Sequence, residues 1–327
     1  MKTRPLAIGL LCLALAGCVG GTPSAAPVAP AGTAAADTTV VRVAALKGPS
    51  GMGLAKVIDA KAPGIQTTVF GTADEVTPAL VKGDLDAALL PANVGAMLNA
   101  RTNGAIQVAA VTILGVLYVV EAGDTVHTTA DLAGKTVLTT GKGTTPQYVA
   151  DFVLGKAGIA DKVDLQYRSE ATEVATALVS GQGKLGILPE PYVTTVLAKN
   201  KNLRVALDLT TEWEKAASGS QLVTGALLVR KQFAAEHPDA FKAFLAAYAD
   251  SAKFVNDSPA DAAKLIAAQG IVPDAATAQA AIPRCHIVAL TGADAKAAVS
   301  AYLKVLYDAN PASIGGKLPD DTFYYGA

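Results

Sequence analysis

The stretch Val43-Ala-Ala-Leu-Lys-Gly-Pro-Ser-Gly-Met-Gly-Leu-Ala-Lys56 contains the strand-to-helix unit around which the chain is organised. An apolar, β-branched run from Thr39 to Ala45 predicts a buried strand. Gly48-Pro49 breaks this run, and Ser50 is a candidate N-cap for the helix that follows. The helical pattern itself extends from about Met52 to Ala60.

A strand that leads through a tight turn into a helix leaves unpaired backbone N–H groups at the helix start. Such groups can receive an anionic or polar ligand group. The alternative is that Gly48 and Pro49 only shape an ordinary connection between strand and helix. The stretch alone does not decide between the two.

The first residues have the features of an export signal. Lys2 and Arg4 precede an apolar run from Leu6 to Leu15, which at ten residues is shorter than the roughly 20 that span a bilayer. Leu15-Ala-Gly-Cys18 resembles the lipobox of bacterial lipoproteins, which implies cleavage after residue 17 and a lipid on Cys18. An ordinary secretion signal with an incidental cysteine is the alternative. Residues 18–38 are rich in Ala, Pro, Gly, Ser and Thr and are predicted to form a flexible tether.

Charge and cysteine content narrow the class of protein. Without Lys2 and Arg4, 25 basic residues face 28 acidic ones, and no basic stripe is present, which argues against a nucleic-acid partner. Cys12 lies in the signal, so with Cys18 lipidated only Cys285 remains. We therefore expect no disulfide within one mature chain, and a core large enough for two lobes must stabilise it.

Short strands alternate with helices from residue 39 onward. Strands are predicted near 39–45, 66–70, 86–90, 106–113, 135–139, 163–168, 185–188 and 203–209. Helices are predicted near 51–62, 74–82, 93–100, 146–157, 172–180 and 191–200. A β-rich run at 222–229 is followed by helices at 237–256, from 259, after Pro273, and at 293–307. This order predicts an α/β fold with parallel sheets and crossover helices.

The same pattern predicts two lobes. Lobe 1 is expected at 39–115 and lobe 2 at 116–220, with a return to lobe 1 at 221–310 and a tail at 311–327 that lies across a lobe. The hinge is expected at two crossing segments, 114–120 and 217–226. An internal repeat supports this division, because Glu75-Val76, Ala79-Leu80-Val81, Gly83 and Leu90-Pro91 recur as Glu173-Val174, Ala177-Leu178-Val179, Gly181 and Leu188-Pro189 at one offset of 98 residues.

Ligands of open α/β sheets lie outside the carboxyl ends of the strands. Four loops are expected there: Gly48–Gly53 and Pro91–Asn93 in lobe 1, and Gly141–Gln147 and Pro189–Tyr192 in lobe 2. The candidate ligand-binding residues are Gly48, Ser50, Gly51, Met52, Asn93, Tyr118, Thr144, Thr145 and Glu190, with Gln147 as a further amide and Lys47 and Lys142 as flanking cations.

These residues suggest different ligand chemistries. The two lysines could favour an anion, whereas Glu190 could accept hydrogen bonds from an amine or an amidine-like ring edge. Met52 and Tyr118 could supply apolar walls, although each could equally belong to the core. A sulfonate, a nitrate-like anion, a zwitterion and an aminopyrimidine therefore all remain open.

No catalytic or metal-binding constellation is apparent. The histidines His127, His237 and His286 lie in separate contexts without metal-ligand spacing. The side chains of Cys285 and His286 diverge as neighbours in sequence, and no glycine pattern fits a dinucleotide fold or a P-loop. We expect no cofactor, no metal and no enzymatic activity.

Together these features resemble a substrate-binding lipoprotein of an ABC importer. The closest group is the nitrate/sulfonate/bicarbonate- and thiamine-pyrimidine-binding proteins of the NMT1/THI5-like, SsuA-like kind. The resemblance covers about residues 39–305. It rests on Leu46–Gly53, the Leu-Pro pairs at 90–91 and 188–189, Glu190-Pro191, and the Asp131-Leu-Ala-Gly-Lys135 turn. No arginine occupies any of the four loops, which argues against a strongly anion-specific site.

The resemblance implies a type II periplasmic-binding-protein fold, with two βα lobes that close around a small ligand. It also implies partners: an ABC permease with its ATPase subunits, and a membrane reached through the lipid anchor. The protein would then be exported, lipid-anchored and monomeric. The alternatives are a ligand-sensing surface lipoprotein without transport and an enzyme on the same fold, of a pyrimidine or menaquinone pathway type.

Overall fold

The computed structural model describes residues 39–327. The predicted signal peptide, the tether and the lipid attachment at Cys18 lie outside the described residues. Those three features therefore remain predictions. None of the helices between residues 39 and 327 is both long and apolar enough to span a membrane.

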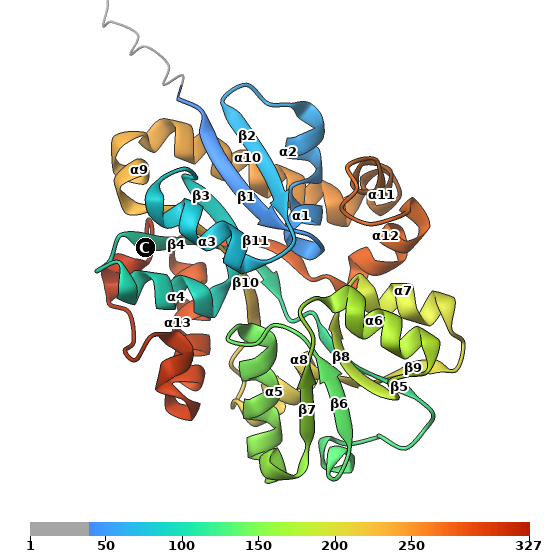
Figure 1. Cartoon of the computed structure of the whole chain (residues 1–327). Helices are drawn as coiled ribbons and strands as arrows, with labels where there is room; N and C mark the ends of the chain where they lie inside the picture. The colour runs from blue at the N-terminus through green and yellow to red at the C-terminus, as the bar shows by residue number, and fades with distance from the viewer. Residues whose placement is uncertain (1–38) are drawn as a thin grey trace, which may run out of the picture. The chain divides into compact units, whose positions relative to one another are not determined.

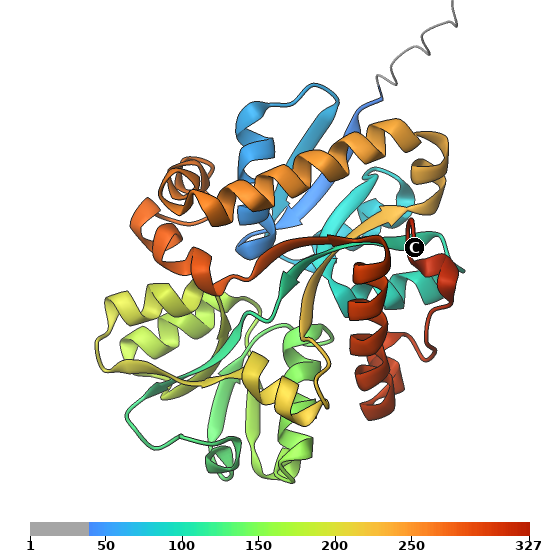
Figure 2. The same ribbon diagram turned by 180° about the vertical axis from the view of Figure 1, so that it is seen from behind.

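Lobe 1, as we call the first sheet with its helices, is built on six strands in the order β11-β4-β10-β3-β1-β2. The strands are β1 (Val41–Leu46), β2 (Ile65–Phe70), β3 (Ala87–Pro91), β4 (Ile106–Leu114), β10 (Val223–Arg230) and β11 (Ile287–Thr291). The helices are α1 (Pro49–Gly53), α2 (Ala55–Ala60), α3 (Ala73–Lys82), α4 (Ala92–Arg101), α9 (Lys231–Glu236), α10 (Pro238–Asp257), α11 (Pro259–Ala268), α12 (Ala275–Ala281) and α13 (Gly292–Ala309). Figure 2 shows the long helix α10 crossing one face of this sheet.

Lobe 2 is built on five strands in the order β7-β6-β8-β5-β9. They are β5 (Leu117–Ala122), β6 (Thr136–Thr139), β7 (Asp164–Tyr167), β8 (Leu185–Pro189) and β9 (Leu203–Asp208). The helices are α5 (Thr145–Lys156), α6 (Ala171–Ser180), α7 (Tyr192–Lys199) and α8 (Leu209–Ala216). Helices α6 and α7 lie side by side in Figure 1.

The chain passes between the two sheets twice, once from β4 to β5 and once from β9 through α8 to β10. The expected α/β architecture with two crossings is confirmed. The expectation of parallel pairing is only partly correct, because the strands that follow each crossing run against their neighbours. Strand β5 is antiparallel to β8 and β9, and β10 is antiparallel to β3 and β4.

The local prediction was wrong around the opening stretch. Instead of one helix at 51–62 there are two short ones, α1 and α2, separated at Leu54. Ser50 lies inside α1, and the N-cap position is Gly48, whose φ of 91° is a left-handed value that favours glycine. Helix α8 and strand β11 were not predicted, and β5 was expected only as a crossing segment, whereas α9 agrees with the helical pattern that begins at Lys231.

The last residues lie against lobe 1, which confirms the prediction that the tail crosses a lobe. Phe323 is buried, and Tyr324 forms a parallel bridge with Val108 of β4. The Gln107 side-chain amide donates a hydrogen bond of 2.8 Å to the carbonyl oxygen of Thr322. The tail thus covers the β4 side of the first sheet.

One hydrophobic cluster contains buried residues from both sheets. At its centre Trp213 of α8 lies between Phe152 of α5 and Tyr302 of α13, with ring centroids 4.6 and 5.3 Å away. All three side chains are buried. Because α13 belongs to lobe 1 and the other two helices belong to lobe 2, this aromatic stack connects the lobes.

Candidate functional site

The four loops at the strand ends meet in two pairs, each with one loop from lobe 1 and one from lobe 2. This is the arrangement expected for strand ends that face each other. The turn at Gly48 packs on the turn at Glu190 and Pro191, since a Cβ added at Gly48 would lie 3.6 Å from Pro191 Cδ and 3.7 Å from the Glu190 carbonyl oxygen. Ser50, 8% exposed, and Gly51 are buried in helix α1 next to this contact. The helix start therefore faces protein in this structure.

Asn93 connects the other pair of loops. Its side-chain oxygen accepts a hydrogen bond of 3.1 Å from the Thr145 hydroxyl, and its amide nitrogen donates to the carbonyl oxygens of Ser313 at 3.1 Å and Gly143 at 3.4 Å. Tyr302 of α13 contributes a further hydroxyl 3.3 Å from the Thr145 oxygen. Asn93 and Thr145 are almost completely buried, so these two candidates serve a contact between the lobes.

Glu190 is completely buried and is paired with a residue that no sequence pattern singles out. One carboxylate oxygen lies 2.6 Å from Nε of Arg284, and the other accepts a hydrogen bond of 3.0 Å from the Thr194 backbone N–H. The Arg284 guanidinium also donates to the Thr194 hydroxyl at 2.7 Å. Because this carboxylate already has its cation, the expectation that it accepts an amine from a ligand does not hold in this structure.

Met52 and Tyr118 are buried in the core rather than lining a cavity wall. Met52 Sδ lies 3.9 Å from the thiol of the buried Cys285. The Tyr118 hydroxyl donates a hydrogen bond of 3.2 Å to the Arg284 carbonyl oxygen, and burial, first among several causes, raises the pKa of Tyr118. Both side chains thus support the segment that carries Arg284.

The second-lobe loop is ordered by its own hydrogen bonds. Thr144, at the N-cap of α5, donates from its hydroxyl to the Gly141 carbonyl oxygen at 2.8 Å. Gln147 accepts from the Gly143 N–H at 2.8 Å, and Lys142 is exposed. These contacts shape the loop, and none of them involves the Lys142 side chain.

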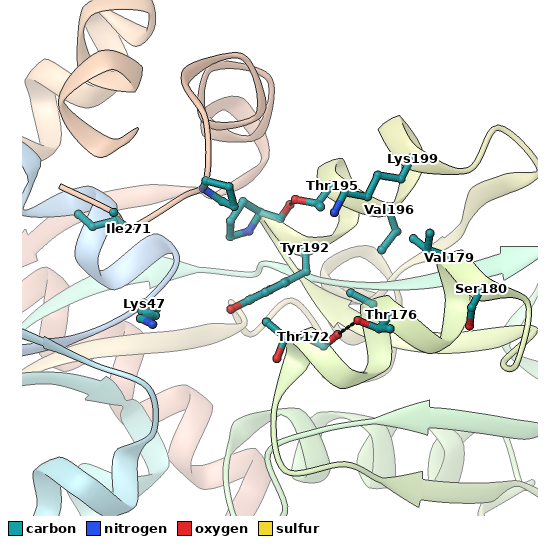
Figure 3. A pocket seen from close by; sticks show the side chains of 14 residues that line it. Lys47, Thr172, Thr176, Val179, Ser180, Tyr192, Thr195, Val196, Lys199 and Ile271 are labelled. Atoms are coloured by element: carbon teal, nitrogen blue, oxygen red, sulfur yellow. Dashed lines mark hydrogen bonds between the residues drawn. The ribbon is translucent and has the colours of Figure 1, made fainter. Parts of the chain in front are cut away.

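A cavity of about 490 Å³ lies beside these loops, between lobe 2 and part of lobe 1 (Figure 3). It is lined by Lys47, Thr172, Ala175, Thr176, Val179, Ser180, Pro191, Tyr192, Thr195, Val196, Lys199, Gly270, Ile271 and Pro273. Lys47 follows β1, Thr172 lies just after β7, and Tyr192 lies just after β8. The cavity therefore opens at the carboxyl ends of strands, where α/β sheets bind ligands.

The lining of this cavity combines positive charge with apolar surface. It includes two lysines and no carboxylate, while Val179, Val196 and Ile271 provide hydrocarbon walls. In Figure 3 the Tyr192 hydroxyl points toward the side on which Lys47 lies. Burial, followed by the charge of Glu170, raises the pKa of Tyr192, so its hydroxyl stays protonated and can donate a hydrogen bond. The cavity suits an anion that carries an apolar part.

Of the candidate ligand-binding residues and flanking cations named from the sequence, Lys47 alone lines this cavity in the described part of the chain. Tyr192 lay inside a predicted loop but was not selected, and Thr172 follows a strand end to which the same rule could have been applied. Ile271 and Arg284 had no signal in sequence, because they lie far along the chain from the loops that they contact.

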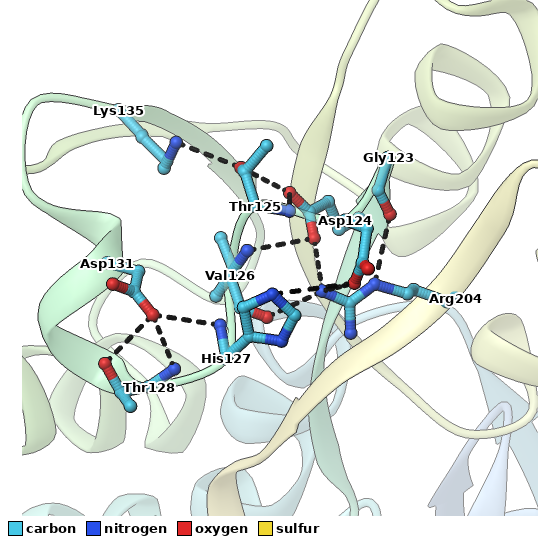
Figure 4. A network of polar contacts seen from close by, with 10 residues as sticks. Gly123, Asp124, Thr125, Val126, His127, Thr128, Asp131, Lys135 and Arg204 are labelled. Carbon is cyan, nitrogen blue, oxygen red and sulfur yellow. Dashed lines mark hydrogen bonds and ion pairs between the residues drawn. The ribbon is translucent and has the colours of Figure 1, made fainter.

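A second polar cluster lies at the β5–β9 edge (Figure 4). The buried Glu121 carboxylate accepts hydrogen bonds from the Thr125 and Val126 backbone N–H groups, and Arg204 lies 2.8 Å away. Burial raises the pKa of Glu121, but the hydrogen bonds from Thr125 and Val126 and the charge of Arg204 outweigh burial and lower it. The cluster satisfies its own polar groups and so stabilises lobe 2.

Within residues 39–327, no group of three or more His, Cys, Asp or Glu side chains could hold a metal ion.

Comparison with known proteins gives a family match over part of the chain and a shared fold. Residues 108–262 match the family described as NMT1/THI5 like. An ABC transporter structure from Parabacteroides distasonis is 26% identical with a TM-score of 0.72, and the match covers 88% of this chain and 98% of that one. No curated protein matches the chain in sequence.

Two sulfonate-binding proteins share the fold. The periplasmic aliphatic sulphonate binding protein SsuA from Escherichia coli is 17% identical with a TM-score of 0.69, over 88% of this chain and 92% of that one. The alkanesulfonate-binding protein SsuA from Xanthomonas axonopodis pv. citri, bound to MOPS, is 18% identical with a TM-score of 0.66, over 88% and 96%. All three structures are named as transporter or binding proteins, not as enzymes. The expected type II periplasmic-binding fold is confirmed.

Proposed function

We propose that the chain binds a small organic anion between its lobes and delivers it to an import permease. The proposal is supported by the match of residues 108–262 to the NMT1/THI5 like family and by the fold that the chain shares with ABC-importer binding proteins. The observation that carries this proposal is the cavity at the strand ends, with its two lysines, no carboxylate and apolar walls. The permease and its ATPase subunits are separate chains.

The cavity lining favours some of the ligand classes that the sequence left open over others. A nitrate-like anion would leave the hydrocarbon walls in contact with water, and a cationic aminopyrimidine would meet two lysines without a free carboxylate. Glu190 cannot supply that carboxylate while it is paired with Arg284. An alkanesulfonate or a carboxylate with a hydrocarbon chain satisfies both the charge and the apolar surface.

The mechanism follows from three contacts between the loops of the two lobes. The pairs Asn93–Thr145 and Glu190–Arg284 join the lobes at the loops, and Lys47 and Tyr192 are next to Gly48 and Pro191, which form the third contact. A ligand held by Lys47 of lobe 1 and Tyr192 of lobe 2 would favour the arrangement in which these contacts form. Binding would thus shift the population of the protein toward its closed form.

We predict that alkanesulfonates raise the midpoint of thermal unfolding, whereas nitrate, bicarbonate and aminopyrimidines leave it unchanged. A ligand at 100 times its dissociation constant adds about 2.7 kcal/mol to the stability of the folded state. Lys47→Met should weaken binding about tenfold, because a charge-assisted hydrogen bond contributes at least about 1.4 kcal/mol, which equals a factor of ten. Thermal-shift titration of the purified protein measures both effects.

Lys142→Met is the matched control for this experiment. Lys142 is an exposed lysine in the corresponding turn of lobe 2, outside the cavity lining, so its removal changes the net charge equally. Equal losses in both variants would assign the effect to net charge and contradict the site. A midpoint shift with aminopyrimidines alone would contradict the ligand class.

The exported, lipid-anchored location is part of the same proposal. It is supported by the resemblance of Leu15-Ala-Gly-Cys18 to a lipobox and by the periplasmic names of related structures. We predict that the mature protein begins at Cys18 and carries a diacylglycerol-type mass addition, which Cys18→Ser abolishes. Intact-mass spectrometry of the membrane fraction tests this, and a soluble, unmodified mature chain would refute the anchor.

A further inference from the structure

We propose that the natural ligand is an extended organic dianion, with one anionic group at Lys47 and the second at Lys199. This inference rests on the proposed function of the same cavity and goes further, because it assigns a specificity role to Lys199. Three features of the cavity support it: the shape, the order of the lining residues and the charges at the two ends.

The cavity is long because it follows two helices. Thr172, Thr176 and Ser180 recur along one face of α6, and Tyr192, Thr195 and Lys199 recur along one face of α7 (Figure 3). Tyr192 and Lys199 are seven residues apart, which corresponds to about 10 Å along a helix. A small inorganic anion cannot occupy such a length.

The middle of the cavity is apolar. Ala175, Val179 and Val196 lie between the two polar rows, and Ile271 and Pro273 of lobe 1 close the other side. Hydrocarbon is the ligand chemistry that gains free energy from contact with these walls. The Thr172 hydroxyl donates to the Glu170 carboxylate, and the hydroxyls of Thr176 and Thr195 donate to backbone carbonyl oxygens of their own helices. Toward a ligand these three hydroxyl groups can therefore only accept a hydrogen bond.

The two positive charges of the cavity lining, those of Lys47 and Lys199, lie toward opposite ends of the cavity. Neither the Lys47 nor the Lys199 ammonium group has a hydrogen bond or an ion pair among residues 39–327. The charge of Lys199 acts on Asp274, whose pKa is lowered first by its hydrogen bonds with Thr277 and only last by Lys199. Because both oxygens of Asp274 cap α12 through Thr277 at 2.8 Å, this carboxylate is already engaged. Two unpaired cations at a cavity without carboxylates favour an anion at each end.

The cavity dimensions set the size of the ligand. A volume of about 490 Å³ is suitable for an organic molecule rather than for a simple ion. An extended chain advances about 3.3–3.6 Å over three backbone bonds, so about 10 Å corresponds to about eight bonds. Octanedioate is therefore a suitable probe, with octanoate and the ω-amino acid of the same length as comparisons.

The test is isothermal titration calorimetry with these three probes on the purified protein. We expect octanedioate to bind about fivefold tighter than octanoate, which is the upper end of what a solvent-exposed ion pair contributes. The ω-amino acid should bind most weakly, because its ammonium group would face Lys199. The preference for octanedioate should decrease as salt concentration rises.

Lys199→Met should reduce the ratio of the two dissociation constants to about one. Lys201→Met is the matched control, because Lys201 is an exposed lysine just beyond α7 whose ammonium group donates to the Leu197 carbonyl oxygen, outside the cavity. The control should retain the wild-type ratio.

Three outcomes would contradict the proposal, and each of them would refute a different part of it. If octanoate and octanedioate bind equally and both depend on Lys47, the dianion inference fails while the proposed function stands. If Lys199→Met keeps the preference, the second anionic group binds elsewhere. If neither octanedioate nor octanoate nor any alkanesulfonate binds, the proposed function fails as well.

Discussion

Replacing Arg284 with alanine is expected to lower the free energy of unfolding by about 3 kcal/mol, because removal of one partner leaves a buried charge without compensation. The Glu190 carboxylate is completely buried, and the Arg284 side chain supplies its only cation within 4 Å among the described residues. Arg284 is itself 40% exposed, so water can partly replace it, and the expected loss lies at the low end for buried pairs. Chemical denaturation measures this difference.

Arg204→Ala provides the matched control. Arg204 is 32% exposed and also pairs with a buried carboxylate, that of Glu121, but both residues lie in lobe 2. Both variants should lose stability, whereas only Arg284→Ala should increase the radius of gyration in small-angle X-ray scattering, because only that pair joins the lobes. An unchanged radius for Arg284→Ala in the absence of ligand would contradict a role in closure.

Trp213→Ala is expected to cost about 4 kcal/mol of stability, within the range measured for large aromatic residues replaced in a core. The indole is completely buried between Phe152 and Tyr302. Its N–H group has no hydrogen-bond partner among the described residues, so the loss arises from packing and from the cavity left behind. Urea denaturation gives the magnitude.

The variant Trp213→Phe separates the contribution of ring packing to stability from the effect of the unpaired indole N–H group. A phenyl ring keeps part of both ring contacts and removes the unpaired N–H, so this variant should lose clearly less stability than Trp213→Ala. Equal losses in the two variants would show that the aromatic stack contributes little. A loss below about 1 kcal/mol for Trp213→Ala, the range of exposed positions, would contradict the packing described here.

Much of the fold could be predicted because it depends on local pattern. The β-branched and apolar strands and the helical periodicity located β1 to β4 and β6 to β9 within a few residues. Strand β11 was missed, since its five residues are an edge strand whose partner, β4, lies about 170 residues earlier. The antiparallel direction of β5 and β10 likewise depends on where the chain crosses, which no local pattern records.

The site was predictable only in outline. The rule that ligands lie at strand ends located the four loops, and the structure brings these loops together in two pairs. The strand-end rule did not indicate that the Glu190 carboxylate would pair with Arg284, which lies 94 residues away in the sequence. The cavity wall is formed by faces of α6 and α7 and by Ile271, so it depends on how the lobes pack. Whether the buried loop residues also contact ligand in another arrangement of the lobes stays a prediction.

The most direct test of ligand binding at this cavity is a crystal structure of the protein with an alkanesulfonate that shifts its unfolding midpoint. We expect electron density for the sulfonate within hydrogen-bond distance of Lys47 Nζ and the Tyr192 hydroxyl, with the hydrocarbon chain against Val179, Val196 and Ile271. Density at the Gly141–Gln147 loop, or a sulfonate bound by Arg284 after release of Glu190, would contradict it.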